Sequence, residues 1–295
     1  MVKRILSSVF LFLVLFLMYL PIFYLIASSF TNTEMVGQWN GFSLKLYVLL
    51  FHDQEVLRAI GNTLILALVS SAVSTLIGTL GAIGLFYSKK GFRNFWEHVN
   101  QIPVVNAEIV MAISLAVTFV FLGDHFFHGQ NLRGFWTLLI GHCCLSVPFV
   151  YLNVKPKLIQ MDPALYEAAL DLGYTPNKAL HKVIYPEIWP GVSSGFALAF
   201  SLSLDDFIVT FFTRGTGLLN GRDTIETIST LVEEKIKRGD VPPSMRAYCT
   251  LLVLVVLTYV IVKTVVSNVQ SKKHGSTLGK NHAKRRNKWN ENPVR

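Results

Sequence analysis

The chain has 295 residues, of which 52% are hydrophobic and 15% are charged, and its mean hydropathy is +0.45. Soluble domains carry about 25% charged residues, so this composition argues against a water-soluble globular protein. The net charge of +9 does not indicate a nucleic-acid-binding protein, because the basic residues lie in short loops and in the C-terminal tail instead of on one face.

Six apolar runs reach or approach the length of about 20 residues that a membrane-spanning helix needs. They are residues 5–28, 62–87, 104–122, 135–154, 191–212 and about 247–266. A cleaved signal peptide is the alternative for the first run. Its apolar stretch is longer than a normal signal sequence and its cleavage site is weak, so we expect an uncleaved span. The sequence therefore predicts an all-α, polytopic membrane protein with six transmembrane helices.

Small residues recur every three or four positions in the second run, at Ser70, Ser74, Gly78, Gly81 and Gly84. This spacing places them along one face of a helix, where small side chains allow a close approach of another helix. We interpret the stripe as a packing feature. The three cysteines lie inside apolar runs without a metal-binding or disulfide-type spacing, and we expect them to be packing residues as well.

Lysine and arginine residues are concentrated on one side of the predicted spans. That side carries residues 3–4, 89–93 and 155–182 and the tail 272–295, whereas the opposite short loops carry few basic residues. The positive-inside rule therefore places both termini in the cytoplasm. The tail, residues 271–295, is basic and polar, and we expect it to be disordered and to anchor the topology, with contact to anionic lipid as an alternative role.

Three acidic residues lie within the predicted spans: Glu108 in the third, and Asp205 and Asp206 in the fifth. A charged side chain at the membrane centre costs at least about 2.5–3.5 kcal/mol on insertion scales, so these residues need a function or a bonding partner. Neighbouring residues point about 100° apart on a helix. Because Asp206 lies on a polar stripe, we expect it to face a substrate pathway and Asp205 to bond to a neighbouring helix. Interhelical hydrogen bonding is the structural alternative for all three.

The long loop between the fourth and fifth runs predicts two short capped helices. Asp162 and Pro163 favour the start of the first helix, and Gly173 favours its end. Thr175 and Pro176 favour the start of the second helix, and Pro186 limits it near Ile184. The first helix is amphipathic and carries the acidic pair Glu167 and Asp171. Such a loop suits docking onto a partner protein, or else is a surface-lying connector.

The loop resembles the EAA loop of the permease subunits of bacterial ABC importers. The resemblance rests on residues 167–169 (Glu-Ala-Ala), Gly173, residues 184–186 and the pair Pro190-Gly191. It implies that a coupling helix within residues 158–191 docks into an ATP-binding subunit. The residues placed in that role are Glu167, Ala168, Ala169, Asp171, Gly173 and Pro186. Tyr174 stands where the family usually has alanine, which implies a bulkier docking surface.

Over nearly its whole length the chain is similar to the PotC-type permeases of spermidine/putrescine ABC transporters. The matching stretches are residues 39–47, 108–114 and 201–209, with Glu108 where that family has aspartate. The resemblance implies a type I ABC-importer (MetI-like) permease fold over residues 1–270, located in the bacterial inner membrane. It also implies polyamine cargo, ATP-binding subunits, a second homologous permease and a periplasmic or lipid-anchored substrate-binding protein. The residues of this chain that are assigned to the substrate pathway are Asp206, Asp205 and Glu108.

The motifs absent from the sequence exclude several other functions. Without a G-x4-GK[ST] phosphate loop the chain is not expected to hydrolyse ATP, so ATP and magnesium are assigned to the partner subunit. The sequence predicts no enzyme, no metal site and no cofactor in this chain. The alternatives are a related permease for thiamine, ferric iron or an anion, an ion-coupled secondary transporter, or a membrane scaffold. The acidic residues argue against an anion.

Overall fold

The computed structural model describes residues 2–33, 38–126, 134–162, 164–215, 225–239, 242–255, 257–258 and 261. Within these ranges the chain is mainly helical, and an isolated β-bridge joins Thr31 and Phe42. It divides into two compact units, residues 53–241 and residues 1–52 together with 242–295. The C-terminal tail predicted at 271–295 lies outside the described residues.

The unit formed by the two chain ends contains α1 (Val2–Ser29), α2 (Lys45–His52) and the helix Ser244–Val255. Helix α1 is apolar and exposed along most of its length, as lipid contact requires. Its C-terminal end is held by a hydrogen bond between Ser29 Oγ and the Tyr47 hydroxyl (2.9 Å). Next to this bond the ring of Phe30 stacks on that of Phe42, with centroids 5.5 Å apart.

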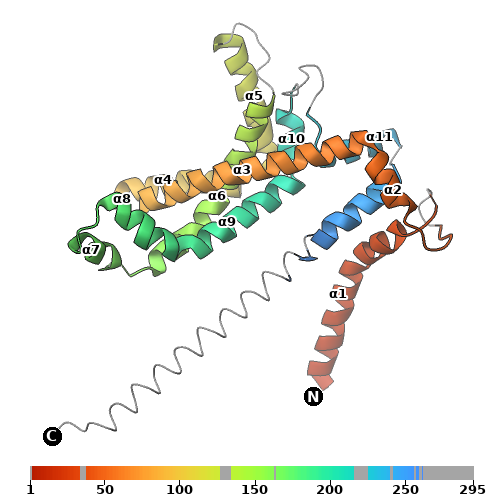
Figure 1. Cartoon of the computed structure of the whole chain (residues 1–295), viewed down its shortest axis with the longest axis horizontal. Helices are drawn as coiled ribbons and strands as arrows, with labels where there is room; N and C mark the ends of the chain where they lie inside the picture. Colours follow the sequence, from red (N-terminus) through yellow and green to blue (C-terminus); the bar gives the residue numbers. More distant parts are fainter. Residues whose placement is uncertain are drawn as a thin grey trace. The chain divides into compact units, whose positions relative to one another are not determined.

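The larger unit is built on three long helices that lie side by side (Figure 1): α3 (Gln54–Phe86), α6 (Phe135–Gln160) and α9 (Tyr185–Asp205). The remaining helices are α4 (Lys90–Val105), α5 (Glu108–Phe126), α7 (Ala164–Asp171), α8 (Pro176–Ala179), α10 (Ile208–Thr213) and α11 (Ile228–Arg238). Buried aliphatic residues, including Val150, Val154 and Ile188, form the core between the three long helices.

Glycine allows the three long helices to approach closely. A Cβ atom on Gly78 would lie 2.8 Å from Val150, and one on Gly191 would lie 2.8 Å from the carbonyl oxygen of Asn153. The packing role expected for the small-residue stripe is therefore confirmed where the stripe faces α6. It is wrong for Gly81 and Gly84, because a Cβ atom at either position would meet no atom within 4 Å.

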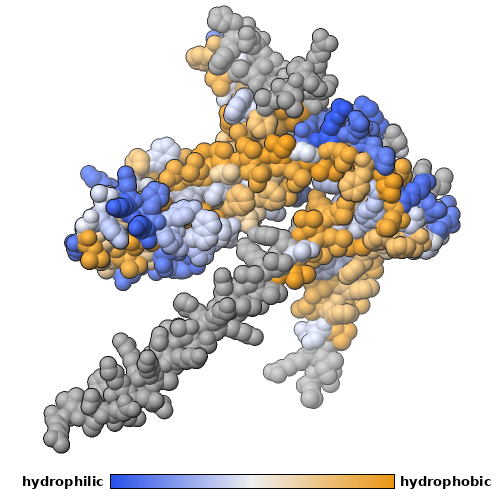
Figure 2. Space-filling view, in the orientation of Figure 1, coloured by the Kyte–Doolittle hydropathy of each residue, from blue (hydrophilic) through white to orange (hydrophobic). Residues whose placement is uncertain are grey.

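Four described helices are long and apolar enough to cross a membrane: Leu6–Ser29, Gln54–Phe86, Glu108–Phe126 and Phe135–Gln160. Their apolar surfaces are visible along α1 and α3 in Figure 2, where polar residues gather at the α7–α8 end of the larger unit. The protein is therefore an all-helical, polytopic membrane protein.

The third and fifth predicted spans are not continuous helices as expected. The third is interrupted at residues 106–107, so that α5 begins only at Glu108. The fifth is interrupted at residues 206–207, between α9 and α10. Of the sixth predicted span, the structure describes Ser244–Val255 and a few following residues, and the rest lies outside the described residues.

Candidate functional site

The two helix interruptions bring the three intramembrane acids together. Glu108 is the first residue of α5, and Asp205 and Asp206 occupy the end of α9. Helix α5 packs against α10, and the Glu108 carboxyl group is in hydrogen-bonding contact with Asp206 and within electrostatic range of Asp205. The structure therefore brings close together the three acids that the sequence analysis assigned to a substrate pathway.

Asp206 is a buried residue that lies two positions before α10 and caps its first turn. One carboxylate oxygen accepts the backbone N–H of Val209 (3.2 Å), and the other accepts both the backbone N–H (2.8 Å) and the hydroxyl group (2.9 Å) of Thr210. Its relative exposure is 5%. The free N–H groups at a helix start favour a negative charge, so the fold itself stabilises this carboxylate.

Asp205 differs from Asp206 in both exposure and helix environment. It is exposed and is the last residue of α9. The C-terminal end of a helix has unpaired carbonyl groups and a partial negative charge, which favour a cation and disfavour another anion. Asp205 therefore carries a negative charge at a position where α9 provides no compensation for it.

The expected orientation of the two aspartates is thus reversed. One helical period continued through residues 191–212 predicts Asp206 on the open side and Asp205 against a neighbouring helix. The interruption at residues 206–207 changes the direction of the backbone, so the period of α9 does not continue into α10. As a result, Asp206 turns into the chain and Asp205 remains exposed.

His142 from α6 connects the two sides of the interruption and was not recognised in the sequence. Its ring is fully buried, with Nδ1 2.8 Å from the hydroxyl oxygen of Ser203 in α9 and Nε2 3.0 Å from that of Thr210 in α10. Nε2 also lies 3.4 Å from the Asp206 carboxylate. The fourth predicted span, residues 135–154, contains no aspartate, glutamate, lysine or arginine. A histidine in the middle of an apolar run was the available signal.

The hydrogen bonds around His142 have a consistent direction. Ser70 donates to Ser203 (2.9 Å), which leaves the Ser203 proton free to be donated to Nδ1. The Nε2–H group can then donate to Thr210, whose own proton goes to Asp206. This order assigns a neutral imidazole with its proton on Nε2. A buried chain of hydrogen bonds therefore joins α3, α9, α6 and α10 to the Asp206 carboxylate.

Within the described residues, no lysine or arginine forms an ion pair with any of the three carboxylates. Irregular backbone at membrane depth is tolerated only where protein covers it or where it lines a water-filled cavity. The protein covers the interruption on the Asp206 side, and Asp205 stands on its exposed side. This arrangement can receive a cation at Asp205, next to Glu108.

The loop between α6 and α9 forms the two short helices that its sequence predicts, but the second helix does not end where it was expected to end. Asp162 accepts the backbone N–H of Ala164 (2.9 Å) at the start of α7, and Gly173 ends it with φ +82°. Thr175 caps α8. The second helix does not end near Ile184 as expected. It continues through a π-helical turn, η1 (Leu180–Ile184), directly into α9, so Pro186 lies in the first turn of α9. Pro163 is outside the described residues.

Helix α7 is fixed on one side and free on the other. Ala169 is buried, and the ring of Tyr166 contacts that of Tyr87 at the end of α3, with centroids 5.4 Å apart. Glu167 is exposed, and the Leu172 side chain is 81% exposed. Among the residues assigned to coupling, Ala168, Asp171, Gly173 and Pro186 are also exposed. Figure 1 shows α7 at the end of the larger unit. An exposed leucine beside acidic groups suits a protein partner.

Comparison with known proteins gives consistent results. Residues 1–271 match the family of binding-protein-dependent transport system inner membrane components. The spermidine/putrescine transport system permease protein PotC of Shigella flexneri is 32% identical over 94% of this chain and 100% of its own length. The putrescine transport system permease protein PotI of Escherichia coli (strain K12) is 30% identical over 80% of this chain and 81% of its own length.

Solved structures show the same fold. A bacterial ABC transporter involved in the import of the acidic polysaccharide alginate contains a chain that superposes with a TM-score of 0.69 at 19% identity, covering 87% of this chain and 93% of that one. The alginate transporter in complex with a periplasmic protein that holds an alginate pentasaccharide gives a TM-score of 0.67 at 17% identity, over 87% and 92% of the two chains.

Proposed function

The chain belongs to the family of binding-protein-dependent transport system inner membrane components, and on this premise we propose that it is the permease subunit of an ATP-driven importer of spermidine and putrescine. It is a non-catalytic, multi-pass subunit of the inner membrane without a cofactor of its own. Relatives that transport these polyamines cover nearly the whole chain. The observation that carries the proposal is the group of three carboxylates at the helix interruptions, which no lysine or arginine of the described chain neutralises.

The three acids have different roles in this proposal. Asp205 and Glu108 provide carboxyl oxygens to the ammonium groups of the polyamine, because these two side chains are exposed or half-buried. Asp206 has a structural role beside the pathway, because it caps the start of α10 and contacts Glu108. Charge-assisted hydrogen bonds between carboxylates and ammonium groups offset the cost of removing the cation from water.

The helical loop, residues 158–191, transmits the action of an ATP-binding subunit in this proposal. The exposed residues of α7, among them Glu167 and Leu172, form the docking surface. Because η1 joins the loop to α9 without a break, a movement of the docked loop is passed to Asp205 at the other end of α9. Ala169 and Gly173 maintain the shape of the loop.

The proposed assembly has six spans in this chain, with both termini in the cytoplasm, and the fifth and sixth spans consist of α9–α10 and the helix that starts at Ser244. The partners are ATP-binding subunits, a second permease, and a periplasmic or lipid-anchored binding protein. A related permease for thiamine or ferric iron is the competing proposal. The polyamine relatives favour spermidine and putrescine over both.

The test is uptake by the complete importer reconstituted in liposomes. We expect ATP-dependent accumulation of labelled spermidine that unlabelled putrescine reduces and that thiamine and ferric iron leave unchanged. Accumulation of thiamine or ferric iron in place of the polyamine would overturn the cargo. Uptake of spermidine without the ATP-binding subunit would overturn the ATP-driven mechanism.

A further inference from the structure

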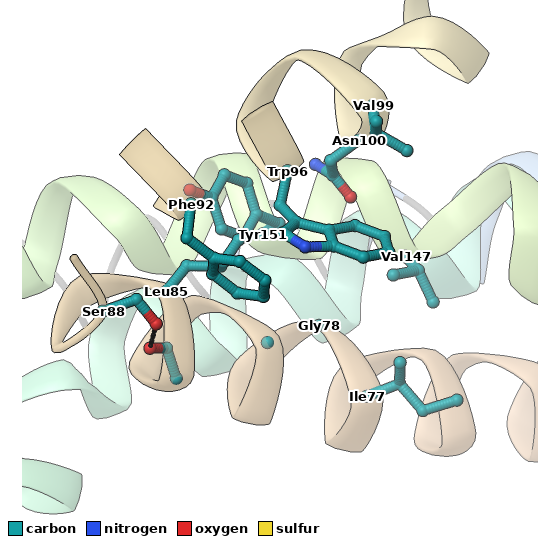
Figure 3. A pocket seen from close by; sticks show the side chains of 12 residues that line it. Ile77, Gly78, Leu85, Ser88, Phe92, Trp96, Val99, Asn100, Val147 and Tyr151 are labelled. Carbon is teal, nitrogen blue, oxygen red and sulfur yellow. Dashed lines mark hydrogen bonds between the residues drawn. The ribbon is translucent and has the colours of Figure 1, made fainter. Parts of the chain in front are cut away.

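An apolar groove of about 530 Å³ lies along one side of the larger unit, between α3, α4 and α6. Figure 3 shows the aromatic side chains of Phe92, Trp96 and Tyr151 around it. Its α3 side runs from Ile77 to Ser88, which is roughly 16 Å of helix. That length matches one leaflet of a bilayer whose hydrocarbon core is about 30 Å thick.

The groove exists because two glycines have no side chain. Gly81 and Gly84 both line it, and a Cβ atom on either would meet nothing within 4 Å. They therefore do not serve the close packing that Gly78 serves on the same helix. Asn100 at the side of the groove has an Nδ2 atom that is buried and has no hydrogen-bond partner. A space of this length, with apolar walls and an unused donor, suits an acyl chain with a polar linkage.

Basic residues lie at the end of the groove that adjoins the C-terminal end of α3. Lys89 and Lys90 follow the groove residue Ser88 and are exposed, and Arg93 lies one turn further along α4. Helix α4 has the composition of a helix that lies at a membrane surface, with Phe92, Phe95 and Trp96 on the apolar side. Positive charge at the mouth of an apolar groove complements a negatively charged lipid headgroup.

The nearby acidic residue does not cancel this charge. Glu97 forms an ion pair with Lys155 (2.9 Å) and accepts a hydrogen bond from the Tyr151 hydroxyl (3.1 Å). The hydrogen bond with Lys155 lowers the pKa of Glu97, so this carboxylate remains ionised at neutral pH. It joins α4 to α6 and holds one wall of the groove in place. Lys89, Lys90 and Arg93 then supply the excess positive charge.

We propose that this groove binds an anionic phospholipid, with one acyl chain between α3, α4 and α6 and the phosphate group at Lys89, Lys90 and Arg93. The proposal depends on the membrane location of the chain and not on its cargo. An occupied groove fills the space between α3 and α4, so the lipid supports the part of the chain that leads from α3 to Glu108.

The fluorescence of Trp96 reports on the groove directly. The complete importer is placed in nanodiscs that contain phosphatidylglycerol or phosphatidylcholine with brominated acyl chains, and the contribution of Trp96 is obtained by subtracting a Trp96→Phe variant. We expect stronger quenching by the brominated phosphatidylglycerol. Each of Lys89→Gln, Lys90→Gln and Arg93→Gln should weaken the preference by up to about fivefold, as expected for one charge at the membrane surface.

A glycine pair on α3 provides a matched control. Gly81→Leu fills the groove and should abolish the quenching difference, whereas Gly61→Leu, in open space elsewhere on the same helix, should retain it. Both variants should assemble with the partner subunits. Equal quenching by the two lipids would overturn the proposal. So would a Trp96 signal that is protected from both lipids in the importer and exposed only after the partner subunits are removed, because a protein would then occupy the groove.

Discussion

The two adjacent aspartates are expected to respond in opposite ways to the same substitution. In Asp206→Asn an amide replaces a carboxylate that accepts two backbone N–H groups and one hydroxyl group. Whichever way the amide turns, its NH₂ group faces a backbone N–H of Val209 or Thr210. Hydrogen bonds to charged groups contribute about 1.5–3 kcal/mol each. Losing one and weakening another gives a destabilisation of about 2–4 kcal/mol.

Asp205→Asn provides the matched control for this experiment, because the residue is exposed and the substitution is the same. Surface substitutions of this kind usually change the free energy of unfolding by less than about 0.5 kcal/mol. The assay is thermal unfolding of the purified importer followed by tryptophan fluorescence, in which each kcal/mol corresponds to roughly 2–4 °C. Equal melting temperatures for Asp206→Asn and the wild type would refute the capping role. A larger loss in Asp205→Asn would refute the assignment of the two positions.

Three further predictions follow from the packing and from the loop. His142→Ala should destabilise the chain by about 2–5 kcal/mol, from lost hydrogen bonds and a cavity, and His142→Gln should recover part of the melting temperature. Gly78→Ala should cost about 1–3 kcal/mol through its clash with α6, whereas Gly81→Ala should be neutral or stabilise the helix by up to about 1 kcal/mol, in the same unfolding assay. Leu172→Asp should reduce co-purification of the ATP-binding subunit at least about tenfold, and the control Ile236→Asp, at an exposed position on α11, should not. Retention of the ATP-binding subunit by Leu172→Asp would remove α7 from the docking surface.

The composition and local motifs predict a large part of this structure. The apolar runs reveal the membrane helices, because their length is set by the bilayer. The caps of α7 and α8 were predictable from Asp162, Gly173 and Thr175, since capping depends on residues that are close in sequence. The three acids were found as candidates because charge is rare within a span.

Features that depend on tertiary packing were not predictable in the same way. The interruption at residues 206–207 is held by His142 from α6, and hydropathy along α9 and α10 contains no information about that contact. Following one helical period across the interruption therefore placed the two aspartates on the wrong sides. The same limit applies to Gly81 and Gly84, because a stripe of small residues does not tell which of its members face another helix.

Spermidine uptake by the reconstituted Asp205→Asn importer tests the central claim most directly. The variant should retain the melting temperature and the subunit composition of the wild type, because the side chain is exposed and stabilises no helix. Its ATP-dependent uptake at low spermidine concentration should fall at least about tenfold, since the loss of one charge-assisted hydrogen bond costs about 1.5–3 kcal/mol. Uptake equal to that of the wild type would contradict the account, because the exposed carboxylate at the end of α9 would then have no part in the cation pathway.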